Sequence, residues 1–276
     1  TAKLLARDKS LRLSFVDLKE AGKIDVDHLE TLLKIPSKKT LVSLMHANNE
    51  IGNLIDLEKI GSLVHQHEAL FHTDTVQTMG HIKLDLSVLP VDFLVGSAHK
   101  FNGPKGVGFL YINYRHKINP FINGGAQERN MRGGTENVYG IVGLAKALEI
   151  AYAEFEEQKM QILMLKKYMI EELIKKIPGV QFNGQCADLN HSLYTVLNVC
   201  LPPTAQADVS SKRVRPDTPS MSTGAPPTTT TTVAVFATVR LTWVLAVKHQ
   251  HRCCSDHTRT DGSQAVRPLR ACPLYA

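Results

Sequence analysis

The first two hundred residues alternate between short apolar runs and stretches with helical spacing of their apolar positions. Helical spacing covers residues 26–34 and 56–67, and Asp56 is suited to cap the second helix. Short apolar runs predict strands at 11–16, 41–46, 69–73, 92–96 and 106–112. Strands joined by helical crossovers predict an α/β fold with a mostly parallel sheet.

A second pattern begins after Gly133-Gly134. Helical spacing continues over 138–177 and stops at Pro178-Gly179, which predicts either two helices or one kinked helix. Short strands at 180–182 and 193–199 predict a smaller α+β unit that is incomplete. From Ala205 onward the periodicity fails, apart from a β-like stretch at 233–247.

Composition changes at the same point. Residues 1–204 hold 23 Lys+Arg and 22 Asp+Glu, a net charge of +1, whereas the last 72 residues hold 9 and 4, a net charge of +5. That tail contains no Glu, Ile or Asn. We therefore predict a large domain over 1–137, a linking helix and the start of a small domain over 138–204, and a divergent, irregular and poorly folded tail over 205–276.

Several classes of protein are excluded by these figures. The hydrophobic share of 43% and charged share of 21% exclude a disordered chain and a multi-span membrane protein. The longest apolar stretch, 233–247, is too short to span a bilayer and contains Arg240, so we expect no membrane partner. Five cysteines are too few for a disulfide scaffold. No charged-then-apolar leader opens the chain, and we expect a cytoplasmic protein.

The basic tail does not predict a nucleic-acid partner, because it contains no recognisable reading module. Its cluster of histidines and cysteines, which includes Cys253 and Cys254, lacks the standard spacing of zinc ligands, so we expect no metal site.

Polar side chains follow three successive predicted strands. Asn49 follows the strand at 41–46, Asp74 and Gln77 follow the strand at 69–73, and Ser97-Ala98-His99-Lys100 follows the strand at 92–96. In an open parallel sheet, ligands bind outside the carboxyl ends of the strands. We therefore expect these side chains to line one crevice.

These residue types suit pyridoxal phosphate. That cofactor needs a lysine for its Schiff base, an acidic partner for its pyridine nitrogen, and hydroxyl and imidazole groups for its phosphate. Taken singly, each residue also has a plain structural interpretation. Lys100 could be a surface lysine, Asp74 a helix cap, His99 a surface histidine and Asn49 a turn residue.

Three ordered motifs make the interpretation specific. Residues 72–77 (HTDTVQ), 97–106 (SAHKFNGPKG) and 124–137 (GGAQERNMRGGTEN) resemble the cysteine desulfurases. These enzymes belong to the class V aminotransferase group of fold-type I pyridoxal-phosphate enzymes, and the resemblance covers residues 14–204.

The resemblance implies a role for each motif residue. Lys100 is similar to the Schiff-base lysine and acid/base catalyst, and Asp74 to the partner of the pyridinium. Gln77 would bond the ring hydroxyl, and Asn49 would lie beside the ring and substrate. Ser97 and His99 would hold the phosphate, and Thr135 would reach the phosphate of a neighbouring subunit, which implies a homodimer.

The implied reaction converts L-cysteine to L-alanine and leaves the sulfur on a protein cysteine as a persulfide. An acceptor such as an iron–sulfur scaffold would then receive the sulfur. Two alternatives stay open: a selenocysteine lyase, and a non-catalytic truncated remnant that binds pyridoxal phosphate or dimerises without turnover.

Two parts of the family pattern are not found. The family has a phosphate-binding segment and a ring-stacking histidine upstream of position 1, and a Ser/Gly-rich loop with the attacking cysteine in its second half. The first would lie upstream of the given sequence. The second is not matched, because Cys253-Cys254 is not flanked by a Ser/Gly-rich loop. We hypothesise that residues from about Ala205 are an out-of-frame translation of a desulfurase gene.

Overall fold

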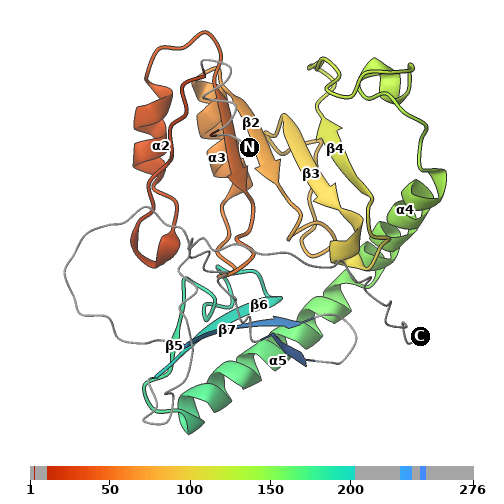
Figure 1. Cartoon of the computed structure of the whole chain (residues 1–276). Coiled ribbons are helices and arrows are strands. Elements are labelled where there is room, and N and C mark those ends of the chain that lie inside the picture. The colour runs from red at the N-terminus through yellow and green to blue at the C-terminus, as the bar shows by residue number, and fades with distance from the viewer. Residues whose placement is uncertain (1–2, 4–10, 203–230, 238–242, 247–276) are drawn as a thin grey trace, which may run out of the picture.

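The computed structural model describes residue 3, residues 11–202, and the backbone of residues 231–237 and 243–246. The strands form two sheets that follow one another in the chain, and two consecutive long helices connect them (Figure 1). The predicted α/β fold with a mostly parallel sheet is confirmed.

The first sheet has the strand order β1-β2-β3-β4. Its strands are β1 (Leu41–Met45), β2 (Leu70–Asp74), β3 (Phe93–Ser97) and β4 (Gly108–Ile112). The first three are parallel, and β4 is antiparallel to β3. Three short 3-10 helices accompany this part of the chain: η1 (Glu20–Gly22), η2 (Ala98–Phe101) and η3 (Glu128–Asn130).

Helices α2 (Val26–Leu33) and α3 (Leu57–Gln66) pack on this sheet. Each begins at an aspartate whose side chain accepts backbone hydrogen bonds. Asp25 accepts them from Asp27 and His28, and Asp56 accepts one from Lys59. The predicted cap at Asp56 is therefore confirmed, and caps of this kind satisfy amides that the first helical turn leaves unpaired.

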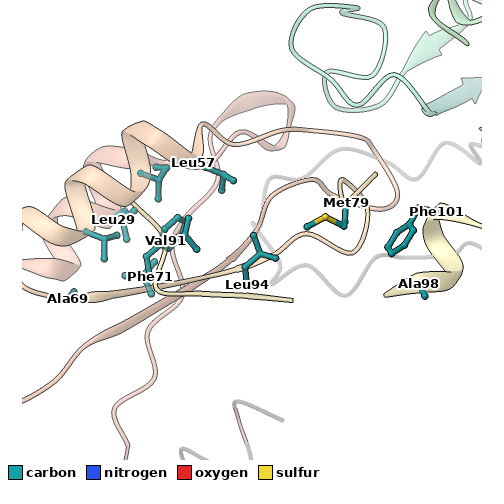
Figure 2. Close-up of a cluster of buried hydrophobic side chains, with 12 residues drawn as sticks. Leu29, Leu57, Ala69, Phe71, Met79, Val91, Leu94, Ala98 and Phe101 are labelled. Carbon is teal, nitrogen blue, oxygen red and sulfur yellow. The ribbon is translucent and has the colours of Figure 1, made fainter. Parts of the chain in front are cut away.

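The core lies between these helices and one face of the sheet. In Figure 2, Leu29 and Phe71 lie at one end of the cluster, and Met79 and Phe101 lie at the other. Burial of Phe101 matters for the site, because it follows Lys100 directly and is only 1% exposed. The core thus extends to the turn that carries the candidate lysine.

The predicted helical stretch 138–177 is two helices, α4 (Val138–Ala153) and α5 (Phe155–Lys176), which meet at Glu154. A second sheet follows, in the order β5-β6-β7-β8, and all its strand pairs are antiparallel. Its strands are β5 (Gln181–Phe182), β6 (Val196–Leu201), β7 (Thr231–Ala237) and β8 (Trp243–Ala246).

The strand predicted at 11–16 is wrong. The structure has no regular element there, and Leu11 and Phe15 are 55% and 62% exposed. Alternating apolar residues favour a strand only where a partner strand is present. Nearby, the backbone makes only the isolated bridge between Leu18 and Ile24.

The division into three parts at 137 and 204 stays a prediction. Strands β7 and β8 fall in the predicted tail, where they match the β-like stretch at 233–247. The remaining residues of that tail, with Cys253 and Cys254 and most of the hypothesised out-of-frame region, lie outside the described residues.

Candidate functional site

The carboxyl ends of β1, β2 and β3 meet at one edge of the first sheet. Met45 pairs with Asp74, and the amide of His46 donates to the carbonyl oxygen of Asp74 at 2.9 Å. Asp74 in turn pairs with Val95, two residues before Ser97. The segments that carry the predicted site residues therefore reach the same edge, as an open parallel sheet requires.

Asp74 ends β2 and is half-buried. Its Oδ1 accepts a hydrogen bond of 2.9 Å from the amide of Val76, which closes a local turn; no helix begins here, so Asp74 is not a helix cap. Within the described part of the chain, its Oδ2 has no hydrogen-bond partner. One carboxylate oxygen thus supports the turn, and the other remains available to a ligand.

Ser97, His99 and Lys100 lie on the tight turn that follows β3. The Oγ of Ser97 and the Nδ1 of His99 are 2.8 Å apart, so the two predicted phosphate-binding groups are already together. His99 and Lys100 are exposed. Among the described residues, the ammonium group of Lys100 has no ion-pair or hydrogen-bond partner.

The backbone of this turn is held firmly, although the side chains of His99 and Lys100 are exposed. The amide of Ala98 donates to Val107 O at 3.1 Å, and the amide of Gly103 donates to Ala98 O at 2.8 Å. Asn102 adopts a left-handed conformation with φ of 65°, which asparagine tolerates better than most residues. The backbone of Lys100 is therefore held in place, while its side chain is exposed.

Asn49 lies in the loop after β1, and its neighbour Asn48 supplies the turn. The side-chain oxygen of Asn48 accepts from the amides of Glu50 and Ile51 at 2.9 and 3.0 Å. Asn49 donates only to the exposed side chain of Glu50, at 2.9 Å. The turn role that Asn49 could have had thus belongs to Asn48.

Gln77 is half-buried, three residues beyond Asp74 in the same turn. Thr135 is different, because it is exposed on the loop between η3 and α4. That loop follows β4, which runs away from the candidate edge. The structure does not bring Thr135 to Lys100 within one chain, and its predicted role concerns a second copy.

The second structural unit, which follows α5 and contains β5 and β6, also supports this edge. The side chain of Asn198, in β6, donates to Glu50 O at 3.0 Å, and the amide of Gln185 donates to the side-chain oxygen of Asn53 at 2.7 Å. The amide of Leu193 donates to Gly52 O at 2.8 Å. The loop that carries Asn49 is therefore bonded to residues within 185–198.

Sequence reasoning missed two histidines near the site. His46 is buried, its Nδ1 lies 2.9 Å from Thr78 Oγ1, and burial lowers its pKa to about 4. His72 Nδ1 lies 2.8 Å from Ser43 Oγ, and burial also lowers its pKa. His72 could have been found, since residues two apart on a strand share a face and Asp74 lies two positions on.

The described residues contain neither a cluster of metal-binding side chains nor a membrane-spanning helix. There, no three or more His, Cys, Asp or Glu side chains gather so that they could hold a metal ion. None of the helices in the same part of the chain combines the length and apolar character needed to cross a membrane.

The donor set fits pyridoxal phosphate. An exposed primary amine can bond to an aldehyde, a carboxylate oxygen is available for a ring nitrogen, and a hydroxyl and an imidazole are paired beside them. The fold is that of the fold-type I pyridoxal-phosphate enzymes. The chain belongs to the aminotransferase class-V family, whose model matches residues 1–212.

Curated relatives sharpen this assignment. The chain is 44% identical over 172 residues to the cysteine desulfurase IscS of Dictyoglomus turgidum, covering 62% of this chain and 43% of that protein. It is 43% identical over 176 residues to the IscS of Methanosarcina thermophila, covering 64% and 43%. The chain thus spans less than half the length of these two relatives.

Solved structures of similar proteins have the same fold. A NifS-like protein superposes with a TM-score of 0.66 at 38% identity, covering 72% of this chain and 53% of that one. The NifS-like protein of Rickettsia africae has the same TM-score at 32% identity, covering 73% and 55%. SspA in complex with cysteine gives a TM-score of 0.60 at 29% identity, covering 73% and 54%.

Proposed function

We propose that the protein is a pyridoxal-phosphate-dependent cysteine desulfurase. It would convert L-cysteine to L-alanine and transfer the sulfur to a protein cysteine as a persulfide. One observation carries the proposal: an exposed lysine on the turn after β3 lies at the same edge of the sheet as an aspartate that ends the neighbouring strand β2. Relatives at 43–44% identity are named cysteine desulfurases.

The side chains at this edge divide the work between them. When bound, pyridoxal phosphate supplies an electron sink for negative charge at the substrate Cα. Asp74 would keep the ring nitrogen protonated through its available Oδ2, and Gln77 would bond the ring hydroxyl. Ser97 and His99 would bind the phosphate, with Asn49 beside the ring and substrate.

Lys100 would hold the cofactor covalently, and its amine would carry protons at the substrate Cα. Its fixed backbone keeps the amine within reach, and its exposed side chain lets the amine move. A base that must swing between two positions needs this combination.

Neither described cysteine suits attack on the substrate sulfur. Cys186 is fully buried, and burial raises the pKa of its thiol; the pKa of the partly buried Cys200 is raised for the same reason. Attack requires an accessible thiolate. The described residues therefore do not supply the attacking cysteine. This favours a second candidate function, that of a cofactor-binding remnant without turnover.

We also propose a homodimer in which Thr135 serves the site of the second copy. Large apolar side chains are exposed on the loop after β4 and in the first turns of α4: Phe121 is 98% exposed, Tyr139 92% and Val142 62%. We infer that they form one apolar patch, since exposed side chains of this kind are typical of an interaction surface. The persulfide would be discharged to an acceptor protein such as an iron–sulfur scaffold.

Purified protein loaded with pyridoxal phosphate tests the function. We expect a visible absorbance band that borohydride removes, labelled peptide at Lys100, and no label in Lys100→Ala. Cysteine with thiol should yield equal amounts of alanine and sulfide. A labelled lysine without alanine identifies the remnant, selenide release from selenocysteine alone identifies a selenocysteine lyase, and a label that persists in Lys100→Ala contradicts the site.

A further inference from the structure

His81 connects the lysine turn to the second structural unit. Its Nε2 lies 3.1 Å from the carbonyl oxygen of Lys100, and its Nδ1 lies 3.3 Å from the hydroxyl of Tyr194. The rings of His81 and Tyr194 meet edge to face, with centroids 6.0 Å apart and an angle of 80°. Tyr194 is only 7% exposed, and its contact with His81 is partly buried.

The chemistry of the two partners fixes which ring nitrogen carries the proton. A carbonyl oxygen can only accept, so the Nε2 of His81 must donate to Lys100. In the neutral ring Nδ1 is then an acceptor, and the hydroxyl of Tyr194 donates to it. Burial lowers the pKa of His81, which keeps the ring neutral.

The segment around His81 is itself held in place. Gly80 has φ of 77°, and a Cβ built there would lie 2.7 Å from the Cβ of Phe101. The hydroxyl of Tyr152 donates to Ile82 O at 3.4 Å on the other side of His81. The imidazole is thus presented to the lysine turn by a backbone that has little freedom to retreat.

The unit that carries Tyr194 is attached to the site a second time. Leu193, its neighbour, donates to Gly52 O in the loop that carries Asn49. The buried Lys166 of α5 donates to Leu193 O at 3.1 Å and so holds this stretch to the helix. Leu193 therefore contacts the loop of Asn49 directly, and Tyr194 reaches the turn of Lys100 through His81.

We propose that His81 is a positioning residue for Lys100, and that through Tyr194 it makes the placement of this lysine depend on the second structural unit. This inference rests on the proposed function, in which Lys100 holds the cofactor. His81 touches only the backbone of Lys100, so its effect is on where the amine is held and not on the chemistry itself.

Two substitutions separate the two ring nitrogens. The amide nitrogen of a glutamine can replace Nε2, so His81→Gln retains the bond to Lys100 O. Asparagine is shorter and reaches only the position of Nδ1, so His81→Asn loses that bond. His191→Asn is the matched control, because His191 is exposed on a surface loop and bonds only to Asp188 and its own turn.

The first readout needs no cofactor. Amide hydrogen exchange over residues 98–103 should be about five- to tenfold faster in His81→Asn than in the native protein, the effect of losing one hydrogen bond. His81→Gln and His191→Asn should stay near the native rate, and Tyr194→Phe should lie between. Equal rates in His81→Asn and native protein would overturn the inference, as would His81→Gln behaving like His81→Asn.

The second readout follows the lysine. The rate at which pyridoxal phosphate becomes fixed to Lys100 under borohydride should fall about five- to tenfold in His81→Asn and recover in His81→Gln. If native protein takes up no label at Lys100, the proposed function fails while the exchange experiment still decides the link. A label at Lys100 that forms equally fast in all variants removes the positioning role alone.

Discussion

Lys166 donates a hydrogen bond of 2.9 Å to the hydroxyl of Ser192, although its side chain is only 1% exposed. The bond joins the middle of α5 to the loop that precedes β6, and a second bond of 3.1 Å reaches Leu193 O. Burial lowers the pKa of Lys166 to about 8 from 10.5. A buried lysine with such a pKa makes the stability of the fold depend on pH.

We predict that the native protein gains stability relative to Lys166→Met between about pH 8 and 10.5. In that window the unfolded chain binds a proton at Lys166 that the folded chain does not, so the free energy of unfolding rises with pH. The relative gain should be on the order of 1–3 kcal/mol. Urea unfolding of both proteins at pH 7, 8, 9 and 10 measures it, and parallel curves would contradict it.

Asp92 should stabilise the end of the sheet that lies opposite the candidate site, and acid should remove this stabilisation. Its carboxylate accepts from Phe71 N at 2.7 Å, from His65 at 2.8 Å and from His116 at 2.6 Å. Burial alone would raise its pKa, but these bonds outweigh burial and lower the pKa. Its stabilisation is present above the unfolded pKa and is lost as pH falls through the lower folded value.

Asp92→Asn should therefore cost about 2–4 kcal/mol near neutral pH, because an amide cannot accept all three bonds. The cost should shrink as pH falls below about 4, the usual range of an aspartate. Glu58→Gln, on the exposed side of α3, is the control and should change little. A cost that stays constant down to pH 2.5 would be evidence against this network.

Gly80→Ala should destabilise more than Gly106→Ala. Both glycines have φ near +80°, so both substitutions carry the strain of about 1 kcal/mol that a side chain meets there. Only at Gly80 does the new Cβ meet another atom, 2.7 Å from Phe101, whereas nothing lies within 4 Å at Gly106. Thermal melts should differ by several degrees, and equal melting temperatures would mean that the close approach has no cost.

Asp74→Asn should leave the fold intact and remove catalysis. The asparagine can still accept from Val76 N, so the turn survives, but it cannot keep a ring nitrogen protonated. We expect alanine formation to fall about 100-fold or more, with an altered visible spectrum of the bound cofactor. Circular dichroism checks the fold, and near-native turnover would exclude the proposed role.

Tyr139→Asp should convert the proposed dimer into a monomer. An aspartate in the middle of a buried apolar contact leaves a charge without a partner. Met160→Asp on α5 is the control, since Met160 is also exposed but lies outside the patch of Phe121, Tyr139 and Val142. Light scattering after gel filtration reports the mass, and a native protein that is monomeric at micromolar concentration would contradict the proposal.

Local patterns were sufficient for most of the first sheet. Asp56 and the helix after it, and the short apolar strands before Asp74 and Ser97, were predictable because each depends on neighbours within a few residues. The strand predicted at 11–16 failed because a strand needs a partner, and partners are chosen by the fold. The antiparallel direction of β4 was equally invisible, since alternation is the same in both directions.

At the candidate site, too, local patterns could be predicted from the sequence and distant contacts could not. The motif around Lys100 was visible in the sequence because its residues are consecutive, and the structure places them on one turn. The contact between His81 and Tyr194 was not, because 113 residues separate them. Lys166 was missed for another reason: within a helix, a lysine is normally interpreted as solvated, and only the packing of α5 shows that it is buried.

The hydrogen bonds that hold the loop of Asn49 to the second structural unit also affect the order in which the chain folds. Its bonds join residues 132 and 148 positions apart, from Asn53 to Gln185 and from Glu50 to Asn198. Contacts of such separation close late, because a long loop must lose its entropy first. A ribosome would have released β1, β2 and β3 long before it delivers the residues that complete this loop. The sheet can therefore form early, while the loop at its edge is fixed only when the chain has returned to it.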